Sequence, residues 1–252
     1  MAFINFNFFS EALGMQTEAY VIMPQRQTAG QIGVTGEAKG EKYKCLYLLH
    51  GLSDDHTIWM RRTSIERYAD KYGICVVMPC AHRSFYSNMK CGMNYYTYIA
   101  KELPRIICEF FNVSDKREDN FVAGLSMGGY GALKIALRES DRFSVGAGLS
   151  SVADIHTALL RNATVTPFGE NVDIPDEDDL FYLADACAEK ENKPRLYTVV
   201  GTEDFLYEDN LRLRDKLAAL PYDYTYVEAP GVHSWDFWDE HIQGVLRWMF
   251  EK

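Results

Sequence analysis

Apolar and polar residues follow a pattern that predicts strands and helices in alternation along most of the chain. Short continuous apolar runs are typical of strands in a parallel sheet covered on both faces, and they lie at 45–49, 74–78, 120–124, 145–150 and 196–200. Helical spacing of apolar residues predicts helices at about 63–72, 97–111, 127–137, 208–220 and 234–249, the last preceded by a strand at 222–228. Strands joined by helical crossovers predict an α/β fold with a mainly parallel central sheet and helices on both faces.

Three segments depart from this alternation. Residues 3–8 and 17–23 are β-rich, so we expect an antiparallel pair to open the chain. Residues 25–42, rich in glycine and polar residues, predict a surface loop. Residues 151–193 carry an acidic cluster around Pro175 and are too short for a core of their own. We expect them to form a cap-like insertion of short helices and loop over the carboxyl edge of the sheet.

A serine stands at the junction of one predicted strand and the helix after it. The segment Gly124-Leu-Ser-Met-Gly128 has the Gly-x-Ser-x-Gly pattern, in which glycines are needed because a tight strand-to-helix turn brings backbone into close contact. Such a turn holds the hydroxyl of Ser126 out at the carboxyl end of the strand. It also lets the amide of Met127, at the positive end of the helix, face a developing oxyanion. The pattern predicts a nucleophile.

A serine hydroxyl needs a histidine base and a carboxylate to orient it, and in this architecture they follow the serine in the order acid, histidine. His233 comes directly after the last predicted strand, and Asp204 directly after the strand at 196–200. We therefore expect Asp204 and His233 to complete the site. A neighbouring carboxylate stays open as the orienting group, and the candidates are Glu203, Glu208 and Asp209. The other histidines fit the base role less well by position, namely His50, His56, His82, His156 and His241.

The first central strand runs into His50-Gly51-Leu52, and this turn predicts the second half of an oxyanion hole. Gly51 allows the loop to turn sharply and aim the backbone amide of Leu52 at the point that Met127 faces. We expect the His50 side chain to orient this loop by hydrogen bonds, with contact to substrate as the alternative. A backbone donor at Leu52 makes the side chain at that position dispensable for the chemistry.

Composition narrows the range of partners. The 252 residues are 47% hydrophobic and carry 26 Lys+Arg against 36 Asp+Glu, a net charge of −10 that argues against nucleic acid as a partner. We expect one domain spanning 1–252. No stretch is apolar enough for a membrane span, and the six cysteines show no Cys-x-x-Cys pair, so free thiols in a reducing cytoplasm are expected. The chemistry predicted here requires no metal and no organic cofactor.

Four motifs now make a family resemblance clear, in the correct order along nearly the whole chain: LYLLHGLSDDHTIW, GLSMGGYGAL, GTEDFLYEDN and PGVHSWDFW. Together they resemble the esterase D-type branch of the α/β-hydrolases, which includes tributyrin, feruloyl and acetyl-xylan esterases, S-formylglutathione hydrolases and mycolyltransferases. The segment HRSFYSNMKCGMNYYTYIAKELP is similar to the small tributyrin-type esterases in particular. The resemblance implies hydrolysis of short-chain acyl esters of small molecules through an acyl-enzyme, with Ser126 as nucleophile, His233 as base and Asp204 as orienting acid.

Three alternatives stay open within this interpretation. An S-formylglutathione hydrolase ranks second, behind the carboxylesterase. Two features count against it: the chain lacks an obvious basic pocket for the glutathione carboxylates, and it carries Tyr130 where thioesterase-type members usually carry histidine. An acyltransferase would share every catalytic residue, and a non-catalytic binding module of this fold ranks low because serine and histidine are both present. A homo-oligomer is compatible with the sequence. Trp59 and Trp235 are proposed to contact substrate, among aromatic candidates that also include Tyr95, Tyr96, Phe168, Phe181 and Phe237.

Overall fold

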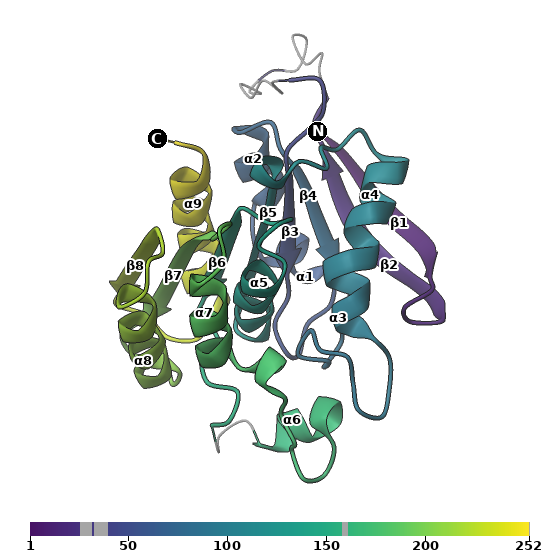
Figure 1. Cartoon of the computed structure of the whole chain (residues 1–252). Coiled ribbons are helices and arrows are strands. Elements are labelled where there is room, and N and C mark those ends of the chain that lie inside the picture. The colour runs from purple at the N-terminus through teal and green to yellow at the C-terminus, as the bar shows by residue number, and fades with distance from the viewer. Residues whose placement is uncertain (26–31, 33–39, 158–160, 252) are drawn as a thin grey trace.

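A central sheet organises the molecule, which is seen here in a computed structural model that describes residues 1–25, 32, 40–157 and 161–251. The described residues form one eight-stranded sheet in the order β1-β2-β4-β3-β5-β6-β7-β8 (Figure 1). Every pairing from β4 to β8 is parallel, and β1 and β2 join antiparallel at one edge. The strands are β1 Ala2–Ser10, β2 Met15–Met23, β3 Cys45–Leu49, β4 Cys75–Pro79, β5 Asn120–Leu125, β6 Val145–Leu149, β7 Arg195–Gly201 and β8 Tyr224–Ala229.

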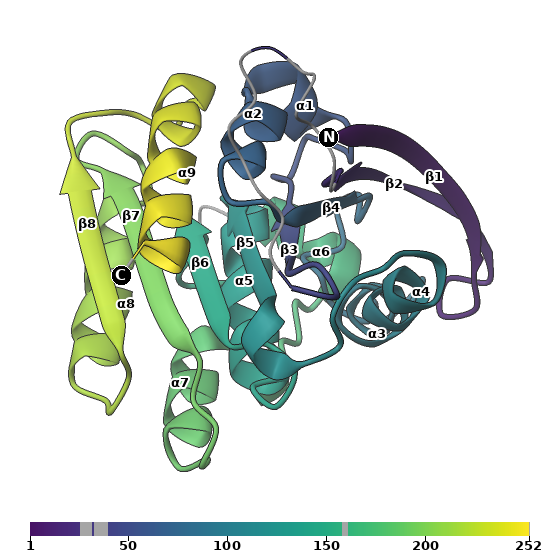
Figure 2. The same cartoon turned by 90° about the horizontal axis from the view of Figure 1, so that it is seen from above.

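Helices cover both faces of this sheet (Figure 2). They are α1 Ile58–Arg62, α2 Ile65–Asp70, α3 Tyr95–Thr97, α4 Leu103–Phe110, α5 Met127–Arg138, α6 Arg161–Phe168, α7 Leu180–Ala188, α8 Tyr207–Ala218 and α9 Trp235–Phe250. Apolar side chains of α1, α2 and α9 pack in one core with alternate residues of the strands. Those of α4, α5, α7 and α8 pack in a second core on the opposite face. The expected α/β fold, mainly parallel with helices on both faces, is confirmed.

The central strand β3 shows why its sequence is apolar without interruption. All five of its residues are buried, with Leu46 and Leu48 in one core and Cys45, Tyr47 and Leu49 in the other. A strand between two helical layers has no solvent face, so its side chains do not alternate with polar ones. Burying each leucine contributes about 1.5–3 kcal/mol relative to leaving it exposed. The same logic holds for β5, whose six residues are all buried.

Two helices differ from the sequence expectation. The helix expected at 63–72 is preceded by a separate short helix, because Thr63 adopts an extended backbone between α1 and α2. The helix expected from residue 97 begins at Tyr95, and a π-helical segment, Tyr98–Glu102, leads into α4. Pro104 lies in the first turn of α4 and has no N–H to donate to the carbonyls of the π-helical segment before it. The proline therefore marks the start of α4.

The expected insertion is narrower than the sequence indicated. Residues 180–188 form α7, which packs against α5 and α8 as an ordinary member of one helical layer. The described irregular part is therefore residues 151–157 and 161–179, which contain α6 and a 3₁₀ turn, Asp176–Asp178. Most of the expected loop at 25–42 lies outside the described residues. No helix in the described part of the chain has both the length and the apolar character needed to cross a membrane.

Candidate active site

The turn between β5 and α5 holds Ser126 in a strained backbone conformation. Its φ of 54° and ψ of −117° lie in a region of backbone conformation that residues other than glycine seldom adopt. A side chain at Gly124 would collide with the Gly128 carbonyl, and one at Gly128 would collide with the carbonyls of Leu49 and His50. Both glycines are thus required by close backbone contact. The Ser126 amide donates to the Leu149 carbonyl at 2.8 Å, which helps fix the turn.

The structure brings Ser126, His233 and Asp204 together from three loops at the carboxyl edge of the sheet. His233 Nε2 lies 3.0 Å from Ser126 Oγ, and His233 Nδ1 lies 2.8 Å from Asp204 Oδ2. Asp204 is 5% exposed and follows β7, while His233 follows β8. A carboxylate can only accept, so Nδ1–H donates to Asp204 and Nε2 is left to accept the serine proton. The three expected side chains are therefore placed so that His233 can take the proton of the Ser126 hydroxyl while Asp204 holds the imidazole.

Burial raises the pKa of Asp204, but hydrogen bonds outweigh it and leave the pKa below its usual value. His233 donates to the carboxylate, and the Leu206 amide donates to Oδ1 at 2.9 Å. Donors of this kind stabilise the ionised form. Asp204 is consequently a carboxylate at neutral pH and can stabilise a positive charge that forms on His233.

The neighbouring carboxylates lie elsewhere. Glu203 is exposed and accepts from the Gly231 amide at 2.5 Å, so its carboxylate faces the backbone of the next loop. Glu208 and Asp209 lie in the first turn of α8, and Asp209 pairs with Arg212 at 2.7 Å. Among the described residues, the carboxylate that contacts His233 is that of Asp204.

His50 ties the loop after β3 to the loop after β4. Its Nδ1–H donates to the Gly51 carbonyl at 2.7 Å, and its Nε2 accepts from the Ala81 amide at 2.9 Å. Tyr86 donates to the His50 carbonyl at 2.8 Å and adds a second link between the two loops. The side chain is 1% exposed, and burial lowers the pKa of His50 to about 4. These contacts agree with an orienting role through hydrogen bonds.

Replacing His50 by glutamine is expected to flatten the acid side of the stability curve. In the unfolded chain the histidine binds a proton below about pH 6.5, and in the folded chain only below about 4. Stability therefore falls as pH drops from 6.5 to 4, by up to about 3 kcal/mol from this group. Urea unfolding at pH 7, 6 and 5 compares the two proteins. Parallel losses in His50→Gln and wild type would contradict the assignment.

A cavity of about 370 Å³ opens at Ser126 and His233, and Leu52 and Met127 both line it. The two residues whose amides are predicted to hold an oxyanion thus lie at the nucleophile. A side chain at Gly51 would collide with Leu125 and with the Asp54 carboxylate, and its Cβ would lie in van der Waals contact with Ser126. The assignment of the two amides as donors stays a prediction.

Of the two tryptophans proposed to contact substrate, only Trp235 lines this cavity. The proposal for Trp59 is wrong in placement: its side chain is 1% exposed, and its indole N–H donates to the Leu49 carbonyl beneath the end of β3. It packs edge-on against Trp235, with ring centroids 5.2 Å apart, and so supports that residue from behind.

Sequence reasoning missed Phe205, which lines the cavity although it is 62% exposed. Its ring lies 4.5 Å from that of His233, centroid to centroid. The sequence could have indicated this residue, because it is a large apolar side chain directly after the expected acid, Asp204, in a predicted loop.

A buried charge pair joins the helix that follows Ser126 to the segments around it. Lys134, fully buried in α5, donates to Asp178 Oδ1 at 2.7 Å, to Ser87 Oγ at 2.7 Å and to the Phe85 carbonyl at 3.0 Å. Burial lowers the pKa of Lys134 to about 8, against the opposing effect of Asp178. Since Phe85 lines the cavity at Ser126, the pair fixes one wall of that cavity to α5 and to the insertion. A lysine within the apolar helical run at 132–137 was the sequence signal for it.

Ser126 has a strained backbone and is joined through His233 to the buried Asp204, at the carboxyl edge of a mainly parallel sheet. This arrangement makes the chain a serine hydrolase with the α/β-hydrolase fold. Comparison with known proteins then narrows the class. The chain belongs to the Esterase family, whose model, described as "Putative esterase", matches residues 10–249. It is accordingly a carboxylic ester hydrolase.

Relatives cover the chain almost completely. An acetyl esterase from Caldicellulosiruptor saccharolyticus is 31% identical over 99% of this chain and 98% of its own length. A Staphylococcus aureus structure titled as the fluorophosphonate-binding serine hydrolase FphF, substrate bound, is 36% identical with a TM-score of 0.86, covering 100% of this chain and 99% of the other. The S-formylglutathione hydrolase FrmB of Staphylococcus aureus has the same identity and TM-score and covers 99% of both chains.

Proposed function

We propose that the chain hydrolyses short-chain acyl esters, of the acetyl or tributyrin type, through an acyl-enzyme on Ser126. The observation that carries this proposal is the 3.0 Å contact between His233 Nε2 and Ser126 Oγ, which lets the imidazole take the proton as the oxygen attacks the ester carbonyl. The amides of Leu52 and Met127 then hold the oxyanion. As this intermediate collapses, His233 gives the proton to the departing alcohol. A water molecule repeats the sequence and releases the acid.

The size of the catalytic cavity supports a small acyl group at the serine itself. About 370 Å³ lies at the low end of ligand pockets, and its walls are mainly Leu, Met, Phe and Trp side chains. The acetyl esterase relative fits this preference. Feruloyl and acetyl-xylan esters, which the aromatic residues also suit, are further candidate substrates.

A second candidate function is thioester hydrolysis, favoured by the 36% identity to an S-formylglutathione hydrolase. Glutathione carries two carboxylates, and a site for it calls for cations. No lysine or arginine is among the described residues that line the cavity at Ser126, and the chain carries a net charge of −10. We therefore rank the carboxylic ester first.

A kinetic panel separates these functions. We expect kcat/KM for p-nitrophenyl acetate and butyrate to exceed that for S-formylglutathione by at least about tenfold, since a carboxylate without a cationic partner is costly to bury. Methyl ferulate and acetylated xylan complete the panel. A tenfold preference for the thioester would overturn the ranking. Adding an alcohol acceptor and measuring the product ratio shows whether acyl transfer competes with hydrolysis.

We also propose that the chain works in a reducing compartment, the cytoplasm, on small-molecule esters and without nucleic acid. All six cysteines are free, and four of them are buried. Buried thiols without a disulfide partner are typical of proteins kept reduced. Assembly into a homo-oligomer stays compatible with this proposal.

A further inference from the structure

The two halves of the expected oxyanion hole come from separate segments, so their spacing depends on contacts between those segments. The Met127 amide belongs to the first turn of α5, and the Leu52 amide belongs to the loop after β3. Donors stabilise an oxyanion best when they are already in place, about 3 Å from the oxygen. A contact that joins this loop to α5 therefore acts on the reaction and not only on the fold.

The peptide planes around Gly51 determine where the Leu52 amide points. His50 Nδ1–H donates to the Gly51 carbonyl at 2.7 Å. The carbonyl and the N–H of one trans peptide point in opposite directions, so the Leu52 N–H points away from the His50 ring. The peptide before it is held by Tyr86, whose hydroxyl donates to the His50 carbonyl at 2.8 Å. Both peptides that lead to the Leu52 amide are thus held by side chains.

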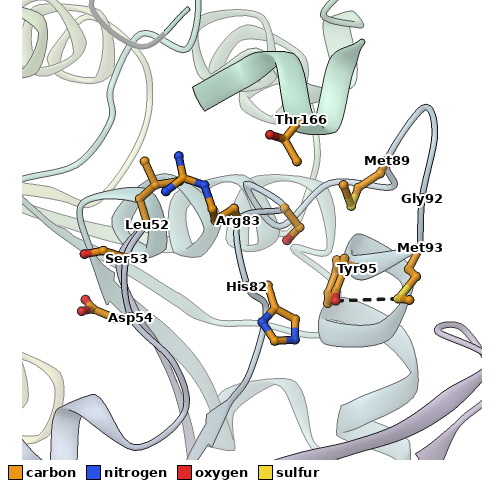
Figure 3. Close-up of a pocket in the computed structure, with 11 residues that line it drawn as sticks. Leu52, Ser53, Asp54, His82, Arg83, Met89, Gly92, Met93, Tyr95 and Thr166 are labelled. Atoms are coloured by element: carbon orange, nitrogen blue, oxygen red, sulfur yellow. Dashed lines mark hydrogen bonds between the residues drawn. The ribbon is translucent and has the colours of Figure 1, made fainter. Parts of the chain in front are cut away.

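Tyr86 comes from a neighbouring loop, the one between β4 and α3. Figure 3 shows this loop beside the loop after β3, because Leu52 of one and Arg83 of the other line a cavity of about 600 Å³. Tyr86 is fully buried and also lies against α5, where a side chain at Gly131 would collide with its ring. Gly131 is one turn after Met127 on the same face of that helix. One tyrosine therefore contacts both segments that carry oxyanion donors.

The backbone that carries this tyrosine is strained and is held by hydrogen bonds. Phe85 and Tyr86 have φ angles of 51° and 52°, in a region that residues other than glycine seldom adopt. Lys134 of α5 donates to the Phe85 carbonyl at 3.0 Å. The Tyr86 amide donates to Ser84 Oγ at 3.0 Å, so the peptide between the two strained residues is held at both its carbonyl and its N–H. Strain of this kind persists only where the surroundings impose it, and it is common at functional sites.

We propose that Tyr86 is a positioning residue, which holds the Leu52 amide at the spacing from the Met127 amide that the oxyanion requires. The inference rests on the proposed function and adds a residue that is not among the described ones lining the cavity at Ser126. Tyr86 acts through the His50 carbonyl. Burial raises the pKa of its hydroxyl well above the usual value, so the group stays a hydrogen-bond donor throughout the neutral range.

Tyr86→Phe removes the hydroxyl, keeps the ring and tests the inference. We expect kcat for p-nitrophenyl acetate to fall about tenfold with KM within about twofold of wild type, because a displaced donor weakens binding of the transition state alone. This loss is smaller than the 10²–10³-fold or so that follows removal of an oxyanion donor, since the Leu52 amide is still present. Tyr222→Phe is the matched control: its hydroxyl also donates to a backbone carbonyl, that of Ala184, at 2.6 Å. It should leave kcat unchanged.

A trifluoromethyl ketone separates positioning from a general loss of structure. Its carbonyl carbon bonds to Ser126 Oγ, the serine proton passes to His233, and the carbonyl oxygen becomes an oxyanion. We expect its inhibition constant to rise about tenfold in Tyr86→Phe, in step with the loss of kcat/KM. Placing 4-aminophenylalanine at position 86 restores a donor on the same ring, and it should return both values to within about threefold of wild type.

A second variant displaces the same ring from the side of α5. Gly131→Ala puts a methyl group against Tyr86 and should reproduce the loss of kcat at constant KM, although alanine is the better helix former. Gly244→Ala in α9 is its matched control, because the added Cβ would lie in ordinary contact, 3.6 Å from the Tyr197 hydroxyl. If Tyr86→Phe fails to fold, Gly131→Ala decides the question by the same criteria.

The outcomes separate the positioning role from the proposed function. A wild-type enzyme that turns over no ester would overturn the function. The labelling rate of Ser126 by a fluorophosphonate would then still test Tyr86, because that reaction also builds negative charge on an oxygen. Unchanged kcat in Tyr86→Phe would overturn the positioning role, and so would a raised KM at constant kcat. A lower thermal midpoint with normal binding of the ketone would reduce Tyr86 to a structural residue and overturn it as well.

Discussion

Ser126→Ala is expected to lower kcat for p-nitrophenyl acetate by about 10⁶-fold, and to leave the thermal midpoint close to that of wild type. The hydroxyl makes one described hydrogen bond, to His233 Nε2 at 3.0 Å, and fills no part of either core. Alanine keeps the Cβ that the strained turn already accommodates. Removing the oxygen therefore removes the chemistry and little of the packing. Initial rates at saturating substrate and a thermal melt measure the two effects.

A fluorophosphonate probe gives an independent reading of the same change. Wild type should be labelled with one equivalent, and Ser126→Ala should not be labelled. Ser64→Ala, at the start of α2, removes a serine whose side chain makes no capping bond and should behave as wild type in both assays. Stoichiometric labelling of Ser126→Ala, or activity above about one per cent, would show that another residue is the nucleophile.

Local pattern was sufficient to predict the sheet, because the strands between two helical layers cannot be polar. Residues 45–49 and 120–124 were expected as buried strands, and β3 and β5 occupy almost the same positions. Helical crossovers between the strands then predicted that the sheet is mainly parallel, whereas the order of the strands came from the structure. The ends of the helices were predicted less well. The extended backbone at Thr63 separates α1 from α2, and the spacing of apolar residues does not indicate such a break.

The site residues were predictable because loops after parallel strands meet at one edge of the sheet. That rule placed Ser126, Asp204 and His233 in one region before any distance was known, and the structure puts them within hydrogen-bonding distance. It does not say which way an aromatic side chain faces. Trp59 lies in α1 after β3 and Phe205 in the loop after β7, yet the first packs beneath β3 and the second is exposed at the cavity.

Side-chain contacts between segments far apart in the chain could not be predicted from the sequence. Lys134 and Asp178 are 44 residues apart, and nothing local indicates that they pair. The pair matters to the site because the same ammonium group holds the Phe85 carbonyl. The removal of either partner would leave a buried charge without compensation, which is among the more costly changes in a protein interior. The insertion is thus anchored to the helix that begins at the nucleophile.

Asp204→Asn is expected to lower kcat by about 10⁴-fold while the fold is retained. The Leu206 amide donates to Oδ1, so in the variant the amide oxygen stays at that position and the NH₂ group replaces Oδ2 opposite His233 Nδ1. An N–H facing Nδ1 favours the tautomer that carries its proton on Nε2, and that tautomer cannot accept from Ser126. The positive charge that forms on His233 also loses its anionic partner. Steady-state kinetics with p-nitrophenyl acetate measures the loss.

Glu203→Gln is the matched control for this change, because it neutralises the adjacent carboxylate and keeps an oxygen that can accept from the Gly231 amide. We expect its kcat to stay within a few-fold of wild type. The pKa of Asp204 is held below its usual value, so the contrast between the two variants should persist from neutral pH well into the mildly acidic range. Activity near wild type in Asp204→Asn, together with a large loss in Glu203→Gln, would move the orienting role to Glu203.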